Sequence, residues 1–355
     1  MSSSTESSLT EGIPQEILDR ITDSVAQKCP ASLSNLSLSS HHFLHRAQSH
    51  IFHTIWISKI QHLTQLLEIA DLDSAVFAHM RTLHLDLSIG HDDTTGRIAE
   101  AVLRFANYLR HLRGLHLEGG RKMHYLLLSP VLRTAVEDIM LKHPISHLSV
   151  HDLQEFPVEL ILPLKSLQAL ELAGRCHHNR LILPTAGGNG NEIIDIPWEL
   201  SALKCDEGGT DLLPFTMAGD KAVYSKLVSL DLAVMGSHHH KAAWAFLEAL
   251  SGSPALRHLA LVYSEDDESP EVSPFFTQQA QSATAFPTLP SLLTLRLTLE
   301  TYGMYATSVA FETFHVFMAE FPATILAKQS QPSLEVLEIT HVVTTSDWTV
   351  LDYGY

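Results

Sequence analysis

The chain has 355 residues, of which 45% are hydrophobic, so it is long enough for one large core or for a small module joined to a larger domain. Its 40 acidic residues outnumber 23 basic ones, and the formal net charge of −17 opposes phosphate binding, so no nucleic acid is expected as a partner. No stretch approaches the roughly 20 apolar residues that span a bilayer, so we expect no membrane association. The three cysteines are widely separated and the N-terminus is polar, which together predict a cytoplasmic or nuclear location.

Residues 1–12 are polar and are expected to form a disordered tail, whereas residues 13–58 predict a module of three short helices. Apolar residues recur at helical spacing in each segment: Ile17, Leu18, Ile21 and Val25; Leu33, Leu36 and Leu38; and Phe43, Ala47 and Ile51. The β-branched Ile55 and Ile57 then indicate a strand. So small a module cannot bury all of its apolar surface, so we expect it to dock onto a partner or a neighbouring domain.

This segment resembles the F-box, in the form found in many fungal proteins. The resemblance lies in IPQEILDRI and in LSNLSLSSHHFLHRAQSHIFHTIWIS, which keep the order and spacing of the family. The matching residues are Ile13, Pro14, Glu16 and Ile17 at the opening, Ser37 and Leu38 in the middle, and Ile51, Phe52 and Ile55 at the close. Phe43 stands where tryptophan is usual, and residues 39–41 replace the usual valine, cysteine and arginine.

The resemblance implies that the module binds a Skp-type adaptor and, through it, the cullin of an SCF-type ubiquitin ligase. The residues expected to bind the adaptor are Ile13, Pro14, Ile17, Leu18, Ile21, Leu36, Leu38 and Phe43. The alternative is a helical cap that seals the domain behind it. We favour the adaptor hypothesis because a cap needs apolar helices but does not need this order of residues.

After a connecting helix at residues 59–79, one pattern recurs, an apolar residue followed three and five positions later by two more. It matches the strand-forming core of leucine-rich repeats. The nine copies begin at Met80, Leu112, Ile145, Leu167, Leu200, Leu227, Leu256, Leu292 and Leu334. The residue between the last two positions of a copy, such as His84, His116, Glu171 or Asp231, faces the opposite side of its strand.

Helical patterns lie between the copies at residues 97–110, 131–142, 241–250 and 308–321, so each repeat is predicted to be strand, loop, helix, loop. Copies begin 22 to 42 residues apart, mostly longer than the about 20–29 of regular repeats. We therefore expect an α/β protein in which residues 80–345 form an irregular solenoid, with a parallel sheet on a concave face that binds an unknown target protein, and a tail at 346–355.

Three loops and three histidine clusters are candidates for phosphate binding, phosphorylation or metal binding. Residues 174–195 contain Gly187, Gly188 and Gly190, but they lack the strand-to-helix context and the Gly-Lys-Ser/Thr motif of a phosphate-binding loop. Residues 206–221 are expected to form an insertion. Residues 263–286 are acidic and serine-rich, which favours a solvated loop over phosphorylation at Ser264. The 23 histidines include three clusters, but none has a second group at zinc-site spacing. We expect no metal, cofactor or catalytic residue, and a protein that is not an enzyme.

Overall fold

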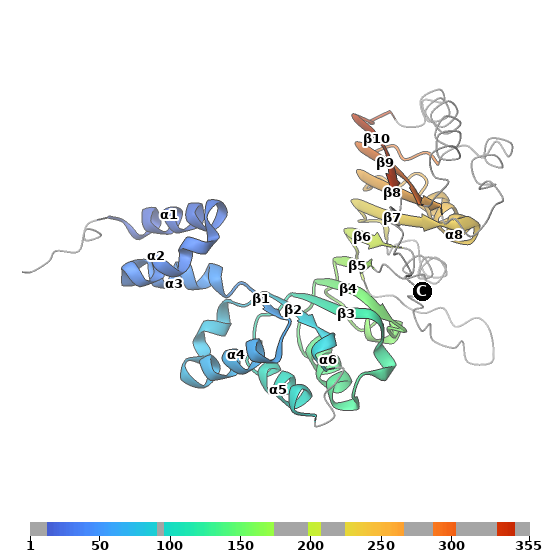
Figure 1. The fold of residues 1–355 in the computed structure, drawn as a ribbon. Helices are drawn as coiled ribbons and strands as arrows, with labels where there is room; N and C mark the ends of the chain where they lie inside the picture. The colour runs from blue at the N-terminus through green and yellow to red at the C-terminus, as the bar shows by residue number, and fades with distance from the viewer. Residues whose placement is uncertain are drawn as a thin grey trace, which may run out of the picture. The chain divides into compact units, whose positions relative to one another are not determined.

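The computed structural model describes residues 13–90, 96–173, 198–206, 224–265, 287–302 and 332–344 (Figure 1). The fold is α/β, and the described strands form one ten-stranded sheet in which β1 to β10 follow one another in chain order. The chain divides into two compact units. Unit 1 is Met1–Glu118 with Leu128–Ile145, and unit 2 is Gly119–Leu127 with Ser146–Tyr355.

Unit 1 begins with three helices where the apolar spacing predicts them. They are α1 (Gln15–Lys28), α2 (Leu33–Ser39), which follows the 3-10 turn η1 (Pro30–Ser32), and α3 (His41–Ile51). The Ser40 side chain caps α3 by accepting a hydrogen bond of 3.3 Å from the His42 amide. Leu18, Leu33 and Ala47 are buried, one from each helix, so the three helices share a small apolar core.

The rest of unit 1 alternates strands with helices. Its elements are β1 (Thr54–Ile57), α4 (Ile60–Leu72), η2 (Ser74–His79), β2 (Thr82–Asp86), η3 (Leu87–Gly90), α5 (Arg97–Ala106), the first part of β3 (Gly114–His124), whose residues from Gly119 on belong to unit 2, and α6 (Pro130–Lys142). The parallel pairs β1–β2 and β2–β3 place Ile55, Leu83 and Leu115 side by side, all of them buried. The expected connecting helix is therefore α4 followed by a 3-10 segment.

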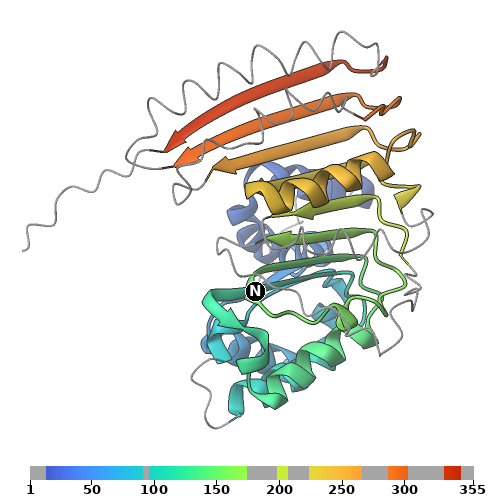
Figure 2. The ribbon, with the colours of Figure 1, turned by 90° about the vertical axis from the view of Figure 1, so that its right-hand side faces the viewer.

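Unit 2 contains the remaining strands and the described helical segments between them. Its elements are η4 (Tyr125–Leu127), β4 (His147–Gln154), η5 (Val158–Leu160), β5 (Ala169–Ala173), β6 (Ala202–Cys205), β7 (Ser229–Met235), α8 (Gly236–Ala249), β8 (His258–Glu265), β9 (Thr294–Tyr302) and β10 (Val336–Thr344). The strands β7 to β10 run side by side in Figure 2, and α8 follows β7 along the chain.

The nine copies of the apolar pattern are confirmed as strands β2 to β10, and their registers align them. Leu170 pairs with Leu203, Leu203 with Leu230, and Leu230 with Leu259. Within the first eight copies every pattern residue is at most 5% exposed, whereas Leu337 and Ile339 of the last copy are only half-buried. The alignment stacks leucines of successive strands into continuous rows, which is how a parallel sheet buries one face.

The boundaries of the two units differ from the expected domain boundaries at residues 58 and 80. The three helices belong to the same unit as β1 and β2, and the main division falls within β3, after Glu118. Several predictions fall wholly or partly outside the described residues: the tails at 1–12 and 346–355, the helix at 308–321, and the loops at 174–195, 206–221 and 263–286.

Candidate functional site

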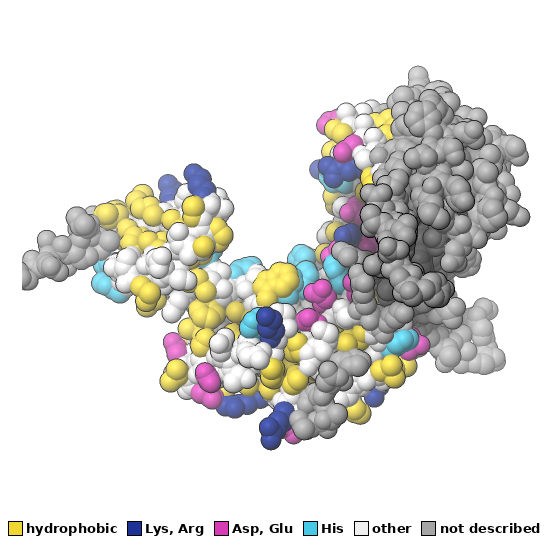
Figure 3. Space-filling view, in the orientation of Figure 1, with side chains coloured by type: hydrophobic (Ala, Val, Ile, Leu, Met, Phe, Trp, Pro, Cys, Tyr) yellow, Lys and Arg dark blue, Asp and Glu magenta, His cyan; other side chains and the backbone are white. Residues whose placement is uncertain are grey.

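The first candidate surface is the apolar face of the three-helix module. Ile13, Ile17 and Ile21 are each 42 to 43% exposed. Ile17 and Ile21, four residues apart, lie on one side of α1, and Ile13 precedes Pro14, the N-cap of that helix. Leu38 on α2 is 83% exposed. Hydrophobic side chains are visible over these helices in Figure 3. Such exposed apolar side chains on short helices are suited to covering by another protein.

The remaining predicted adaptor-binding residues occupy different environments. Pro14 is exposed, and Leu36 and Phe43 are half-buried, so all three can contribute to a surface. Leu18 is only 1% exposed and belongs to the core of the module. It points inward because it lies one position after Ile17, about 100° further around the helix. Leu18 therefore supports the surface from below and does not form part of it.

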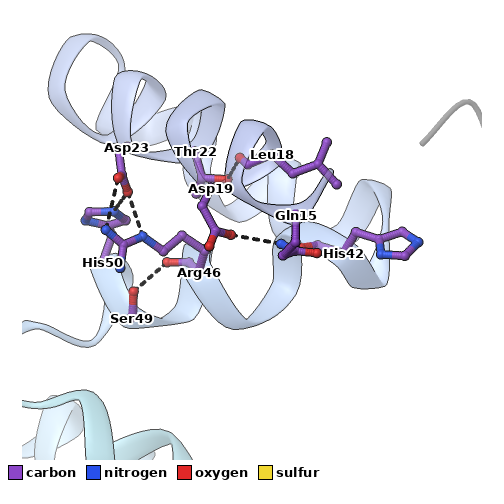
Figure 4. Close-up of polar contacts among 9 residues, drawn as sticks. All are labelled: Gln15, Leu18, Asp19, Thr22, Asp23, His42, Arg46, Ser49 and His50. Carbon is purple, nitrogen blue, oxygen red and sulfur yellow. Dashed lines mark hydrogen bonds and ion pairs between the residues drawn. The ribbon is translucent and has the colours of Figure 1, made fainter. Parts of the chain in front are cut away.

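Polar contacts hold α1 against α3. The Asp23 carboxylate accepts two hydrogen bonds from Arg46, of 2.7 Å from Nε and 2.9 Å from Nη2, and its Oδ1 lies 2.7 Å from His50 Nε2 (Figure 4). Gln15 adds a bond of 2.9 Å from its Nε2 to the His42 carbonyl. The hydrogen bonds from Arg46, and then from His50, lower the pKa of Asp23 from 3.8 to about 2. This cluster keeps the exposed face of α1 in a defined position relative to α3.

The second candidate surface is a stack of rings along β1, β2 and β3. Trp56 stacks on His84 with ring centroids 3.6 Å apart and planes at 10°, and His84 stacks on His116 at 3.9 Å and 8°. Parallel pairing brings the three residues into register, since Trp56 pairs with His84 and His84 with His116. Trp56 is 59% exposed. We call Trp56, His84 and His116 the ring ladder.

The third candidate surface is a row of polar side chains in unit 2, at the position between the two inner leucines of each copy. Ser149 donates a hydrogen bond of 3.0 Å to Glu171 Oε2, and Lys204 donates one of 2.7 Å to Glu171 Oε1. On β9 and β10, Arg296 Nε lies 2.9 Å from Glu338 Oε2. Neighbouring strands thus carry opposite charges that pair across the sheet.

Burial and pairing shift several titrating groups of this row. The close contact with His151, and then the hydrogen bond from Lys204, hold the pKa of Glu171 well below its ordinary value. The nearby Glu171 carboxylate in turn raises the pKa of His151, although His151 Nε2 lies 3.4 Å from it, an ion-pair distance rather than a well-formed hydrogen bond. Burial raises the pKa of Asp206 and of Asp231, against the opposing charge of Lys204. The row is a largely self-neutralised polar surface, suited to recognition by hydrogen bonds.

The histidine clusters are the remaining candidates for ligand binding. The His41 and His42 rings lie 3.9 Å apart, and in the described ranges no group of three or more histidine, cysteine, aspartate or glutamate side chains is placed to hold a metal ion. Residues 176–178 and the side chains of residues 238–240 lie outside what the structure describes. Cys205 is fully buried, and burial raises the pKa of its thiol far above the range of a reactive nucleophile.

None of the helices in the described part of the chain is long and apolar enough to cross a membrane.

Sequence reasoning missed two of these arrangements. The ring ladder was within reach, since His84 and His116 occupy the same outward position of successive copies, but Trp56 lies on a strand that precedes the nine copies. The Asp23, Arg46 and His50 cluster joins residues 23 and 27 positions apart on two helices, and no local pattern signals it.

In comparisons with known proteins, no family model and no curated protein matches this sequence.

Proposed function

We propose that this protein is the substrate-recognition subunit of an SCF-type ubiquitin ligase. In this proposal the three-helix module binds a Skp-type adaptor, and the outward side of the strands holds a target protein. The strands would form a leucine-rich-repeat solenoid, with catalysis supplied by the partner enzymes. The observation that carries the proposal is the exposed apolar stripe of Ile13, Ile17 and Ile21 on a module whose own core is already filled by Leu18 and its neighbours.

Burying this stripe against a protein partner would be energetically favourable. Fully burying a large apolar side chain contributes about 1.5–3 kcal/mol, so covering the exposed 42–43% of one isoleucine contributes about 0.6–1.3 kcal/mol. Three such residues, together with the more exposed Leu38, could supply several kcal/mol. That is a useful fraction of the roughly 8 kcal/mol that corresponds to micromolar affinity.

The polar strand faces support the second half of the proposal. Their side chains are paired across strands, so they present a preorganised pattern of charges and hydrogen-bonding groups rather than a catalytic arrangement. A protein surface of complementary pattern would be a suitable partner.

The test is co-purification of the full chain with a Skp-type adaptor. We expect the parent protein to retain the adaptor and the variants Ile17→Asp and Ile21→Asp to lose it, because each would place a carboxylate in an apolar interface. Leu72→Asp is the matched control, since Leu72 is 88% exposed on α4 and lies outside the module. Leu18→Asp is unsuitable because it would disrupt the core of the module. Absence of the adaptor from the parent protein, or equal loss with Leu72→Asp, would refute the proposal.

A second candidate function is a repeat scaffold whose helices only cap the sheet. It is favoured by the packing of Phe52 edge-on against Phe77 at 6.1 Å, which joins the end of α3 to η2. A cap needs this contact but not the exposed isoleucines. If the helices are only a cap, Phe52→Ala should lower thermal stability and Ile17→Asp should change neither stability nor any interaction of the protein.

A further inference from the structure

The ring ladder lies on an edge strand with one aromatic face open. Trp56 is on β1, the first strand of the sheet, and its ring stacks on His84 on the side of β2. Because 59% of Trp56 remains exposed, the opposite face of its indole is accessible to a ligand. Cross-strand stacking stabilises the sheet locally, but it does not require an exposed tryptophan at the end of the row.

Two carboxylates lie on the same side of the strands as the ladder. Asp86 and Glu118 are paired in register, each two residues after a ladder histidine, and a rise of about 3.3 Å per residue places them about 7 Å along the strands. Asp86 Oδ1 accepts a bond of 2.8 Å from the Ser88 amide. Within the described ranges, neither carboxylate forms an ion pair with a basic side chain, whereas Glu171 in unit 2 is paired with Lys204.

Figure 3 shows histidine and acidic side chains gathered beside hydrophobic ones in the region of β1 to β3. An open aromatic face attracts a cation, and the carboxylates on β2 and β3 add to this attraction through their negative charge. A phosphate-bearing ligand would be repelled by Asp86 and Glu118, and the chain as a whole carries a net charge of −17. The chemistry of this surface therefore selects a planar cation.

We propose that the ring ladder, with Asp86 and Glu118, is a binding site for an arginine side chain of a partner protein. The guanidinium group would stack on the open face of Trp56, and the negative charge of Asp86 and Glu118 on the neighbouring strands would favour its approach at low salt. Lysine fits less well, because its ammonium group is a compact, strongly hydrated charge that cannot stack. That the arginine belongs to a protein destined for ubiquitin transfer rests on the proposed function, whereas the binding itself does not.

The experiment uses the full chain labelled with 5-fluorotryptophan and a blocked pentapeptide, Gly-Gly-Arg-Gly-Gly. Fluorine NMR at low salt and pH 8 follows the Trp56 resonance during titration. We expect a saturable shift with the arginine peptide, a weaker response with lysine in its place and none with citrulline, which keeps the planar shape without the charge. The Trp56 signal is assigned by its loss in Trp56→Phe.

Variants test the contribution of each group, with peptide affinity measured by calorimetry. We expect Trp56→Ala to weaken binding by about 2- to 30-fold, the range of a cation stacked on an exposed or partly desolvated ring. Trp56→Phe should fall between parent and Trp56→Ala, and the double variant Asp86→Asn, Glu118→Gln should also weaken binding. Leu72→Ala, at an exposed apolar position away from the ladder, is the matched control and should bind as the parent does.

Three outcomes would overturn the proposal: no shift of Trp56 at millimolar peptide, an equal shift with citrulline, or unchanged affinity in the variants. Its failure can be told apart from failure of the adaptor function. Ile17→Asp should lose the adaptor but keep the peptide, and Trp56→Ala should lose the peptide but keep the adaptor. Thermal unfolding of each variant shows whether the fold is intact before the binding result is read.

Discussion

Truncating a leucine on a central strand of the sheet should cost far more stability than truncating the corresponding leucine on the last described strand, β10. Leu230 on β7 is fully buried, with Leu203 and Leu259 on its two neighbouring strands. Leu337 occupies the same pattern position on β10 but is only half-buried, and it pairs with Leu295. The substitutions Leu230→Ala and Leu337→Ala remove the same atoms, so their difference isolates the effect of burial.

The expected magnitudes follow from that burial. Truncating a fully buried leucine to alanine typically costs about 2–5 kcal/mol, the sum of lost transfer free energy and the cavity left behind. Leu337 is half-buried and pairs with a leucine of one neighbouring strand, β9. Leu337→Ala should therefore lower the free energy of unfolding by about 1 kcal/mol or less. We therefore expect the cost of Leu230→Ala to exceed that of Leu337→Ala by at least about 1 kcal/mol.

Urea unfolding followed by tryptophan fluorescence measures both variants, because the buried Trp198 and Trp244 report on unit 2. Hydrogen exchange of the β7 and β10 amides distinguishes local opening from global unfolding. Equal free-energy changes for the two variants, or a larger change for Leu337→Ala, would refute the reasoning that the aligned rows form the core.

Two further predictions concern a single ion cluster and a single glycine. Asp23→Asn should destabilise unit 1 by about 0.5–1 kcal/mol at pH 7, a value reduced for solvent screening because the carboxylate is 34% exposed. Because folding lowers the pKa of Asp23 from 3.8 to about 2, its stabilisation is present above about pH 4 and disappears as the pH falls toward 2. The difference between Asp23→Asn and the parent in urea unfolding should therefore shrink at pH 3. Gly119→Ala should lower the free energy of unfolding by at least about 2 kcal/mol, because the new Cβ would lie 2.3 Å from the Asp152 carbonyl oxygen. Gly114→Ala, on the same strand, should cost less, because its Cβ meets only the movable Thr82 side chain. Thermal unfolding of the two variants measures the difference.

The repeating strands could be predicted from the sequence because the signal is local and repeated. Each copy, such as Leu227, Leu230 and Leu232, specifies a strand with one apolar side, and parallel strands can bury that side only when the copies are aligned. The helices of the module were equally accessible, since Pro14 and Pro30 lie at helix boundaries and the apolar spacing marks their inner face.

Tertiary structure decided which residues form surfaces. Leu18 and Ile17 look alike in the sequence, and only the packing of α1 against its neighbours shows that the first is buried and the second 43% exposed. The ring ladder also depends on the fold, because Trp56, His84 and His116 are about 30 residues apart and meet only when β1, β2 and β3 pair in one register. Local patterns determined the elements and their apolar sides, while long-range register and packing determined which side chains remain available to a partner.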